Sequence, residues 1–433
     1  MNSAPSHQTI IRYLDTEFSK PIRDPLWGHI YVNTAMMELV YSAPLQQLNR
    51  IKQLGPTYLV YPGAAHTRLN HSLGVLHMAR RMIRTLITFE TAPKISLESV
   101  KAFLCAALLH DVGHFPYTHS LKELPLKEHE TLTGEIIQRP PLSTLLSNTV
   151  GVDPHMTACI VDLGLPDEGN EEIRFFRRLL SSPLDPDKLD YLNRDAYFCG
   201  VPYGIQDSDF VLSQILPHPE YGIGLFENGI SALENLLFSK YQMYRAVYWH
   251  RTVRIATGMI KKALFLGLQS GSLQPEQLYN LDDEGFFVLL QEQHSPEFKL
   301  VADVQNRRLF KPVCELPFSP QNSTHTALRE LSLRINMEAQ IAAVLQRNTG
   351  GSVSPRQVLI DIPEDISFEV DIPVYTTDGW IPYSSARSVF TPQVVRDFTD
   401  TLRLIRVAVD PQLLPLPDSA LHELTEILQH GMA

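Results

Sequence analysis

The segment "ALLHDVGHFPYTHSL", residues 107–121, places three histidines and one aspartate within ten positions, directly after an apolar run. Imidazole nitrogens and carboxylate oxygens are common ligands of divalent metal ions, and imidazole also transfers protons near neutral pH. A buried helix that ends in His110-Asp111 therefore indicates chemistry at that end.

A mixed ligand set can be assembled around this pair of residues. Two imidazoles and two carboxylates would come from His71, His110, Asp111 and Asp187. Such a set suits Mn, Fe, Ni, Mg or Zn with open positions more than a closed thiolate site. A metal of this kind lowers the pKa of bound water, polarises a phosphoryl oxygen and lets hydroxide attack phosphorus. We predict a divalent metal cofactor and hydrolysis of a phosphate ester or anhydride.

Each ligand taken alone has a simpler explanation. A single histidine facing a helix interior is more often a hydrogen-bonded core residue, which is the alternative for His71. An aspartate in the first turn of a helix, such as Asp187, often just complements the helix dipole. The combination of these residues carries the prediction.

Further side chains near these ligands are suited to phosphate. The residues His114, His119 and His129 can donate to phosphate oxygens or act as general acids, with loop capping as the alternative for His114. Arg68 precedes His71 by three residues and suits bidentate phosphate contact, although an isolated arginine is usually a solvated surface residue.

Helical patterns position these residues. Apolar residues recur with helical spacing from about 69 to 89, and a second helix begins after the N-cap Ser96 and ends before Gly113 and Pro116. A third helix begins after Asp185 and stops at Gly200, which places Asp187, Tyr191 and Asp195 on one face.

The remaining chain is predicted to be helical up to about residue 350 and mixed afterwards. A long helical region from about 230 to 268 stacks Lys240, Tyr244 and Tyr248, and further helices are expected near 276–292 and 324–347. The segments "QVLIDI", "FEVDIPVY" and "LRLIRVAV" alternate as strands do, so an α+β region is expected from about residue 350.

Composition excludes several classes of protein. The net charge of −11 and the pI of about 5.8 disfavour broad binding to nucleic acid or to an anionic membrane. The four cysteines are widely spaced, which suggests neither a zinc knuckle nor a disulfide framework. Neither a signal peptide nor a stretch long enough to span a membrane is apparent. We expect a soluble, cytoplasmic protein. The anchors of P-loop, Rossmann, zincin and serine-hydrolase sites are lacking.

Four ordered motifs resemble those of the HD-domain phosphohydrolases: "HTRLNHSLGV" (66–75), "LLHDVGHFPYTHSL" (108–121), "KEHE" (127–130) and "LDPDKLDYLNRD" (184–195). Upstream, "IRDPLWGHIYV" and "LNRIKQLGPTYLVYPGAAHTRLNHSLG" are similar to the deoxynucleoside triphosphate triphosphohydrolase branch, which contains the SAM- and HD-domain enzyme. The likeness extends from about residue 20 to 260, and the C-terminal strands resemble the same branch.

The resemblance implies a mainly α fold, an HD-domain helical bundle with a smaller α+β C-terminal region. We expect an N-terminal segment (1–60) that packs on the HD core, the catalytic core (61–270), a helical extension (271–350) and the α+β region (351–433). It implies release of a deoxynucleoside and triphosphate from a dNTP, through attack at the α-phosphorus, by a homo-oligomer, a dimer or tetramer.

The resemblance also implies site residues. The metal is held by His71, His110, Asp111 and Asp187. The phosphates are surrounded by Arg68, His114, His119, His129 and Lys188. The residues expected to contact the sugar are Gln53, Leu54, Tyr191 and Asp195. Tyr248 is expected to stack on the deoxyribose and to leave no space for a 2′-hydroxyl. Lys240 and Tyr244 complete the expected substrate-binding set.

Two departures and three alternatives qualify these expectations. Lys240 replaces an arginine for the γ-phosphate, and Lys122 stands where the branch has an acidic residue, with Glu123 one place late. The branch's allosteric guanine contacts fall on Tyr41 and Asn49, so activation by GTP is not predicted.

The alternatives are an HD hydrolase of another nucleotide, one of a phosphodiester, and a non-catalytic nucleotide-sensing or nucleic-acid-binding HD protein.

Overall fold

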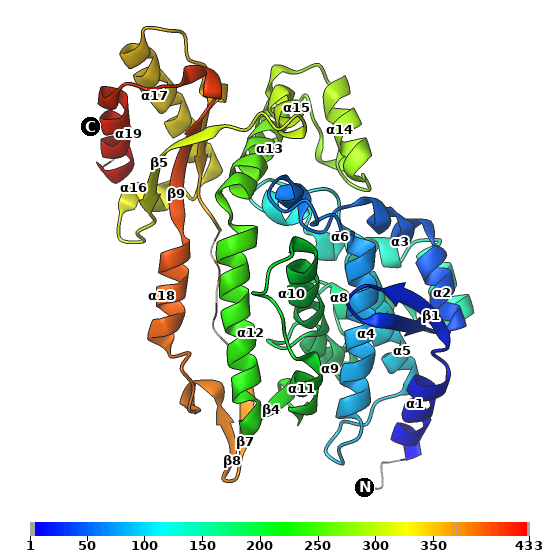
Figure 1. Cartoon of the computed structure of the whole chain (residues 1–433). Helices are drawn as coiled ribbons and strands as arrows, with labels where there is room; N and C mark the ends of the chain where they lie inside the picture. The colour runs from blue at the N-terminus through cyan, green and yellow to red at the C-terminus, as the bar shows by residue number, and fades with distance from the viewer. Residues whose placement is uncertain (1–4, 365, 367, 369, 431–433) are drawn as a thin grey trace.

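The computed structural model describes residues 5–430 except 365, 367 and 369 (Figure 1). Helices form most of this part of the chain, and short strands build small sheets. The mainly α fold with a smaller α+β C-terminal region is thus confirmed. Among the described helices, none combines the length and the apolar character that a transmembrane segment requires.

The α-helices up to residue 270 are α1 Pro5–Thr16, α2 Thr34–Tyr41, α3 Ala43–Gln47, α4 Arg68–Leu86, α5 Leu97–Leu109, α6 His129–Ile137, α7 Leu142–Leu145, α8 Pro154–Val161, α9 Glu171–Leu180, α10 Pro186–Cys199, α11 Ser208–Ser213, α12 Ile230–Met243 and α13 Arg251–Ser270. Those that follow are α14 Asp283–Glu292, α15 Lys299–Gln305, α16 Ser323–Ala327, α17 Leu331–Thr349, α18 Pro392–Leu402 and α19 Asp418–His430.

Helices α4, α5 and α10 form the centre of the N-terminal bundle (Figure 1). Helix α5 is apolar on every face, and its side chains from Phe103 to Leu109 are fully buried. The predicted caps are confirmed: Ser96 accepts from the backbone N–H of Ser99, and Asp185 accepts from that of Lys188. Gly200 ends α10 with φ 68°, as a C-terminal glycine does.

The predicted helical region from 230 to 268 consists of two helices with a break between them. Helix α12 widens into a π-helical turn over Tyr244–Tyr248, and α13 starts only at Arg251. The break lies at His250, whose backbone is non-helical (ψ 133°) and whose Nδ1 accepts from the N–H of Thr252. The His250 side chain thus caps the first turn of α13 by accepting from one of its free backbone N–H groups. A new helix therefore begins here, and α12 does not continue.

The strands build three sheets among the described residues. A hairpin joins β1 Lys20–Asp24 to β2 Gly28–Val32. A second sheet has the order β3-β4-β7-β8, built from β3 Ile215–His218, β4 Gly222–Phe226, β7 Pro373–Thr376 and β8 Gly379–Pro382. The third has the order β5-β9-β6, built from β5 Lys311–Pro317, β9 Leu404–Val409 and β6 Val358–Asp361.

Two of these pairings differ from the expected organisation. Strand β5 comes from the segment 271–350, which was expected to be helical, and it pairs along β9. Its alternation is weak and it contains Pro312 and Pro317, so its sequence pattern does not indicate a strand. Strand β7 pairs in parallel with β4 of the N-terminal bundle, and it begins at Pro373, later than "FEVDIPVY" predicts; residues 367 and 369 lie outside the described part.

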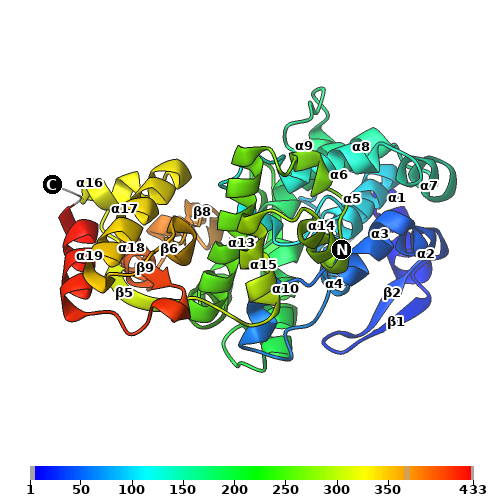
Figure 2. The same ribbon diagram turned by 90° about the horizontal axis from the view of Figure 1, so that it is seen from above.

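Buried ion pairs join the C-terminal part to α13, beside which it lies (Figure 2). The Arg254 guanidinium donates to Asp361 Oδ1 at 2.7 Å, and Lys262 Nζ contacts Glu338 Oε2 at 2.5 Å. Lys262 also donates to the carbonyl oxygens of Pro355 and Val358. These cations satisfy charges and carbonyls that burial would otherwise leave unpaired.

Candidate active site

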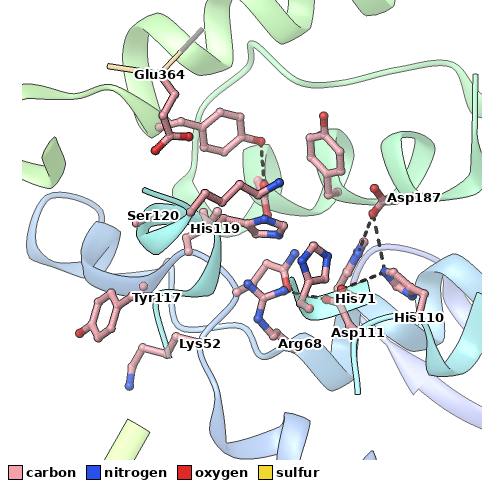
Figure 3. Close-up of a pocket in the computed structure, with 18 of the residues that line it drawn as sticks. Lys52, Arg68, His71, His110, Asp111, Tyr117, His119, Ser120, Asp187 and Glu364 are labelled. Atoms are coloured by element: carbon pink, nitrogen blue, oxygen red, sulfur yellow. Dashed lines mark hydrogen bonds and ion pairs between the residues drawn. The ribbon is translucent and has the colours of Figure 1, made fainter. Parts of the chain in front are cut away.

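A cavity of about 810 Å³ opens between the N-terminal bundle and the first turns of α13 (Figure 3). Most of the residues singled out in the sequence line it: Gln53, Leu54, Arg68, His71, His110, Asp111, His119, His129, Asp187, Tyr191, Asp195, Tyr244 and Tyr248. They come from the segment before α4, the start of α4, the end of α5 and the turn after it, the start of α6, α10 and the π-helical turn, so the fold brings distant segments to one place.

The four predicted metal ligands converge on one side of this cavity (Figure 3). Asp187 Oδ1 lies 2.9 Å from His71 Nε2 and 3.9 Å from His110 Nε2. Asp111 Oδ1 lies 3.3 Å from His110 Nε2. The ligand atoms of His71, His110 and Asp111 are all within 4.8 Å of one another, as binding of a single ion requires.

Both histidines of this set are oriented by an acceptor on the opposite ring nitrogen. Nδ1 of His71 donates to Asp190 Oδ2 at 2.9 Å, and Nδ1 of His110 donates to the carbonyl of Ala107 at 2.9 Å. The proton at Nδ1 leaves the Nε2 lone pair to a metal ion. Nε2 of His110 is buried and makes no hydrogen bond, so the donor set fits a divalent ion.

Asp190 was not predicted from the sequence. Arg194 holds both of its carboxylate oxygens, at 2.8 and 2.9 Å, and thereby fixes the oxygen that orients His71. Burial alone lowers the pKa of His71, but Asp187 and Asp190 outweigh it and raise that pKa to about 10. The two carboxylates create a negative potential that attracts a cation. The spacing of Asp190, three residues after Asp187 on one helix, was the available signal.

Asp111 joins the ligand set to an arginine. Arg68 Nη1 donates to Asp111 Oδ2 at 2.7 Å, while Oδ1 faces His110. Burial alone raises the pKa of Asp111, but His114, His110 and Arg68 outweigh it and hold that pKa well below its usual range. The carboxylate is therefore ionised and available as a ligand at neutral pH.

The three other histidines form a cluster behind Arg68. The ring centroids of His114, His119 and His129 lie 4.0 to 4.9 Å apart, and Nε2 of His114 is 3.1 Å from Nε2 of His119. Burial, His129 and Arg68 lower the pKa of His119 to about 3. Burial and the charge of Arg68 also lower the pKa of His114. His119 and His129 face the cavity, whereas His114 lies behind them and is not part of its lining.

Aromatic and acidic side chains form the neighbouring wall. The Tyr248 hydroxyl donates to Asp195 Oδ2 at 2.7 Å, and His66 Nε2 lies 2.8 Å from Asp195 Oδ1. Burial and Asp195 raise the pKa of Tyr248 well above its usual value, so the phenol is neutral. The Tyr191 ring is 6.5 Å from the Tyr248 ring, centroid to centroid. Asp195 is thus held from both sides and fixes the Tyr248 ring.

Two predicted substrate contacts lie away from the cavity lining. Lys188 Nζ donates to the carbonyl of Ser182 and contacts Asp185, and it is not part of the cavity lining. Lys240 Nζ lies 5.3 Å from the centroid of the Phe368 ring. Burial and Lys188 lower the pKa of Lys240 to about 8.

Residues to which the sequence analysis gave no role in the site also line the cavity. Lys52, Tyr117, Ser120, Glu130 and Glu364 line the cavity. Lys122, which stands where the branch has an acidic residue, also lines it, whereas Glu123 turns away to Lys261 and Arg334. Tyr117 has φ 66°, which no sequence pattern signalled.

The fold and this site define an HD-domain protein. The "HD domain" family matches residues 68–150, and "HD associated region" matches residues 217–382. The protein YwfO of Bacillus subtilis, which is uncharacterised, is 32% identical over 338 residues, covering 72% of this chain and 75% of YwfO. The chain therefore belongs to the HD-domain phosphohydrolase family.

Two further likenesses, one in sequence and one in fold, accompany this assignment. The deoxynucleoside triphosphate triphosphohydrolase SAMHD1 homolog of Dictyostelium discoideum is 24% identical over 407 residues, covering 87% of this chain and 74% of that protein. A solved phosphohydrolase structure from Bacteroides thetaiotaomicron has a TM-score of 0.70 at 23% identity, covering 90% of this chain and 99% of its own, and shows the same fold. The chain spans between 55% and 75% of the length of its first curated relatives.

Proposed function

We propose that this protein is a metal-dependent hydrolase that converts a dNTP to a deoxynucleoside and inorganic triphosphate. The observation that carries the proposal is the convergence of His71, His110, Asp111 and Asp187 at one side of a cavity large enough for a nucleotide. The likeness to SAMHD1 homologs, which are named as dNTP triphosphohydrolases, supports the choice of substrate.

The ligand set would hold the metal, for which we propose Mn, Fe, Mg, Ni or Zn. When bound, such an ion supplies Lewis acidity toward a phosphoryl oxygen and lowers the pKa of a coordinated water. The protein's part is orientation: Asp190 and the Ala107 carbonyl fix the two imidazoles, and Arg68 fixes Asp111. This arrangement lets the ligands bind without further rearrangement.

Arg68, Lys122, His119 and His129 border the cavity beside the ligands and would contact the phosphates. In the proposed reaction, an oxygen of water bonds to the α-phosphorus and the bond from phosphorus to the 5′-oxygen breaks. The leaving 5′-oxygen takes a proton, for which His119 is the proposed donor. A bound triphosphate raises the pKa of His119, because a nearby negative charge favours the imidazolium form.

The wall that contains Tyr248 would contact the sugar. Asp195 and His66 immobilise the Tyr248 hydroxyl, so the ring has a fixed position in the cavity. A deoxyribose packed on this ring leaves no room for a 2′-hydroxyl, and Tyr191, Gln53 and Leu54 complete the proposed contacts.

One observation favours a second candidate, the hydrolysis of another nucleotide or phosphate ester. Lys240, the expected partner of the terminal phosphate, lies over Phe368 and does not line the cavity. A substrate with fewer phosphates does not need this contact.

The test is incubation of the purified protein with each dNTP and, in turn, Mn, Fe, Mg, Ni or Zn, followed by anion-exchange separation of the products. The proposal expects deoxynucleoside and triphosphate in equal amounts. Pyrophosphate or monophosphate as product would overturn the proposed reaction, because the bond to the 5′-oxygen would then be intact, whereas turnover of another nucleotide or phosphate ester in the same assay would establish the second candidate. If no product forms with Mn, Fe, Mg, Ni or Zn while dNTPs raise the melting temperature, the dNTP hydrolase proposal is rejected in favour of a nucleotide sensor.

A further inference from the structure

Glu364 lies on the side of the cavity away from the ligand set. It follows strand β6, and it lines the cavity together with Trp249 and Thr257 of the neighbouring wall. Figure 3 shows its carboxylate turned into the cavity, across from Asp187 and His110. No motif of the N-terminal bundle contains this residue.

We propose that Glu364 is a specificity-determining residue that accepts hydrogen bonds from the nucleobase and favours guanine over thymine. The proposal rests on the proposed function, because it requires a dNTP in the cavity. It adds discrimination among the four bases, to which the metal ligands and the residues beside the sugar, Tyr248 and Asp195, do not contribute.

The two cations near Glu364 are bound more closely by other carboxylates. Lys261 Nζ lies 3.9 Å from Glu364 Oε1 but forms a shorter contact with Glu123. Arg254 donates to Asp361 at 2.7 Å and to the carbonyl of Ile362 at 3.0 Å. The Glu364 side chain retains 37% of its exposure, so its carboxylate keeps acceptor capacity toward a ligand.

The order of groups in the cavity assigns Glu364 to the base. In the proposed complex, the metal ligands and Arg68 lie at the phosphates, and Tyr248 and Asp195 contact the sugar. The base lies beyond the sugar, and Glu364 lines the cavity together with Trp249, the residue after Tyr248 in the chain. Figure 3 shows Glu364 across the cavity from the ligands Asp187 and His110.

Carboxylates accept hydrogen bonds and cannot donate them when ionised. Guanine offers two adjacent donors, N1–H and the 2-amino group, which match the two carboxylate oxygens. Adenine and cytosine each offer one amino group, whereas the single N3–H of thymine is flanked by two carbonyl oxygens that a carboxylate repels. A bidentate contact of this kind discriminates between bases by about 5- to 150-fold.

The experiment compares kcat/KM for dGTP, dATP, dCTP and dTTP between the wild type and Glu364→Gln. A glutamine keeps the size but offers an amide N–H₂, which pairs with a thymine carbonyl. We expect a wild-type dGTP to dTTP ratio of at least about 5, and a decrease of that ratio by a similar factor in the variant. Glu292→Gln, at an exposed position of α14, removes the same charge elsewhere and leaves the ratio unchanged.

An identical base ratio in the wild type and in Glu364→Gln overturns the inference while leaving the proposed function intact. If the wild type cleaves no dNTP, the proposed function fails separately. The same four nucleotides are then compared by their dissociation constants, and an unchanged ratio of these constants between the two proteins again rejects the role of Glu364.

Discussion

The two sides of the cavity differ in how far apart in the sequence their parts lie. The ligand side is built by α4, α5 and α10, whose apolar side chains belong to one continuous core. The opposite side is built by α13 and the segment after β6, which are fastened by the buried pair of Arg254 and Asp361. Both sides combine apolar packing with buried ion pairs, but the ligand side joins helices of one bundle, whereas the opposite side joins α13 to a strand whose Asp361 lies 107 residues after Arg254.

Removing a ligand should have the largest effect. We expect Asp111→Asn to reduce bound metal to a small fraction per chain and to lower kcat by at least about 10³, because the ion supplies several kcal/mol of transition-state stabilisation. Elemental analysis and a product assay on the same sample measure both quantities. His422→Ala, at an exposed position of α19, is the control. Full metal content in Asp111→Asn would contradict the assignment of this ligand.

Breaking the opposite side should reduce stability and leave the metal in place. Arg254→Met removes the closest partner of the buried Asp361, which costs about 3–5 kcal/mol of unfolding free energy in comparable pairs. Urea denaturation measures this loss. The control Arg251→Met, at a side chain that is 61% exposed, should change stability by less than about 0.5 kcal/mol.

The comparison of the two sides fails if Arg254→Met loses metal as completely as the ligand variant does. That result would mean that the ligand side depends on the charged pairs and is not held by its own apolar packing. Metal content of the folded Arg254→Met protein therefore decides between these two descriptions.

A smaller effect is expected from acid. Burial alone raises the pKa of Glu123, but Arg334 and Lys261 outweigh it and lower that pKa to about 2 from its ordinary 4.5. A lowered carboxyl pKa adds stability above pH 4.5, and this contribution, about 3 kcal/mol, is lost as the pH falls from 4.5 toward 2. The unfolding free energy, measured in urea at a series of pH values, should follow this course.

The matched variant for this test is Glu123→Gln, which cannot ionise at that position. The difference in unfolding free energy between wild type and variant should be largest above pH 4.5 and should shrink toward pH 2. A difference that stays constant over this range would show that the proton affinity of Glu123 does not change on folding.

Much of the ligand side could be predicted from the sequence, because its signals are local. The caps Ser96 and Asp185 and the stop at Gly200 fix two helices, and the His110-Asp111 pair at the end of an apolar helix points to a metal. The roles of these ligands stay predictions. Local hydrogen bonds and hydrophobic periodicity suffice here because each helix end is specified by its own few residues.

The other side could not be predicted, because it depends on long-range pairing. Strand β5 carries two prolines and forms only against β9, and Glu364 reaches the cavity through the pairing of Arg254 with Asp361. The predicted stacking of Lys240 with Tyr244 and Tyr248 assumed an uninterrupted α-helical period, which the π-helical turn after Met243 changes. Neither the turn nor the pairing has a local signal.

The arrival of Glu364 from the far end of the chain has a consequence for synthesis. A nascent chain emerges from its N-terminus, and its domains fold in that order. Helices α4, α5 and α10 have all emerged before residue 200, whereas Glu364 follows more than 150 residues later. The metal ligands can thus assemble on the ribosome well before the opposite side of the cavity exists, so a nascent chain exposes an open ligand set during translation.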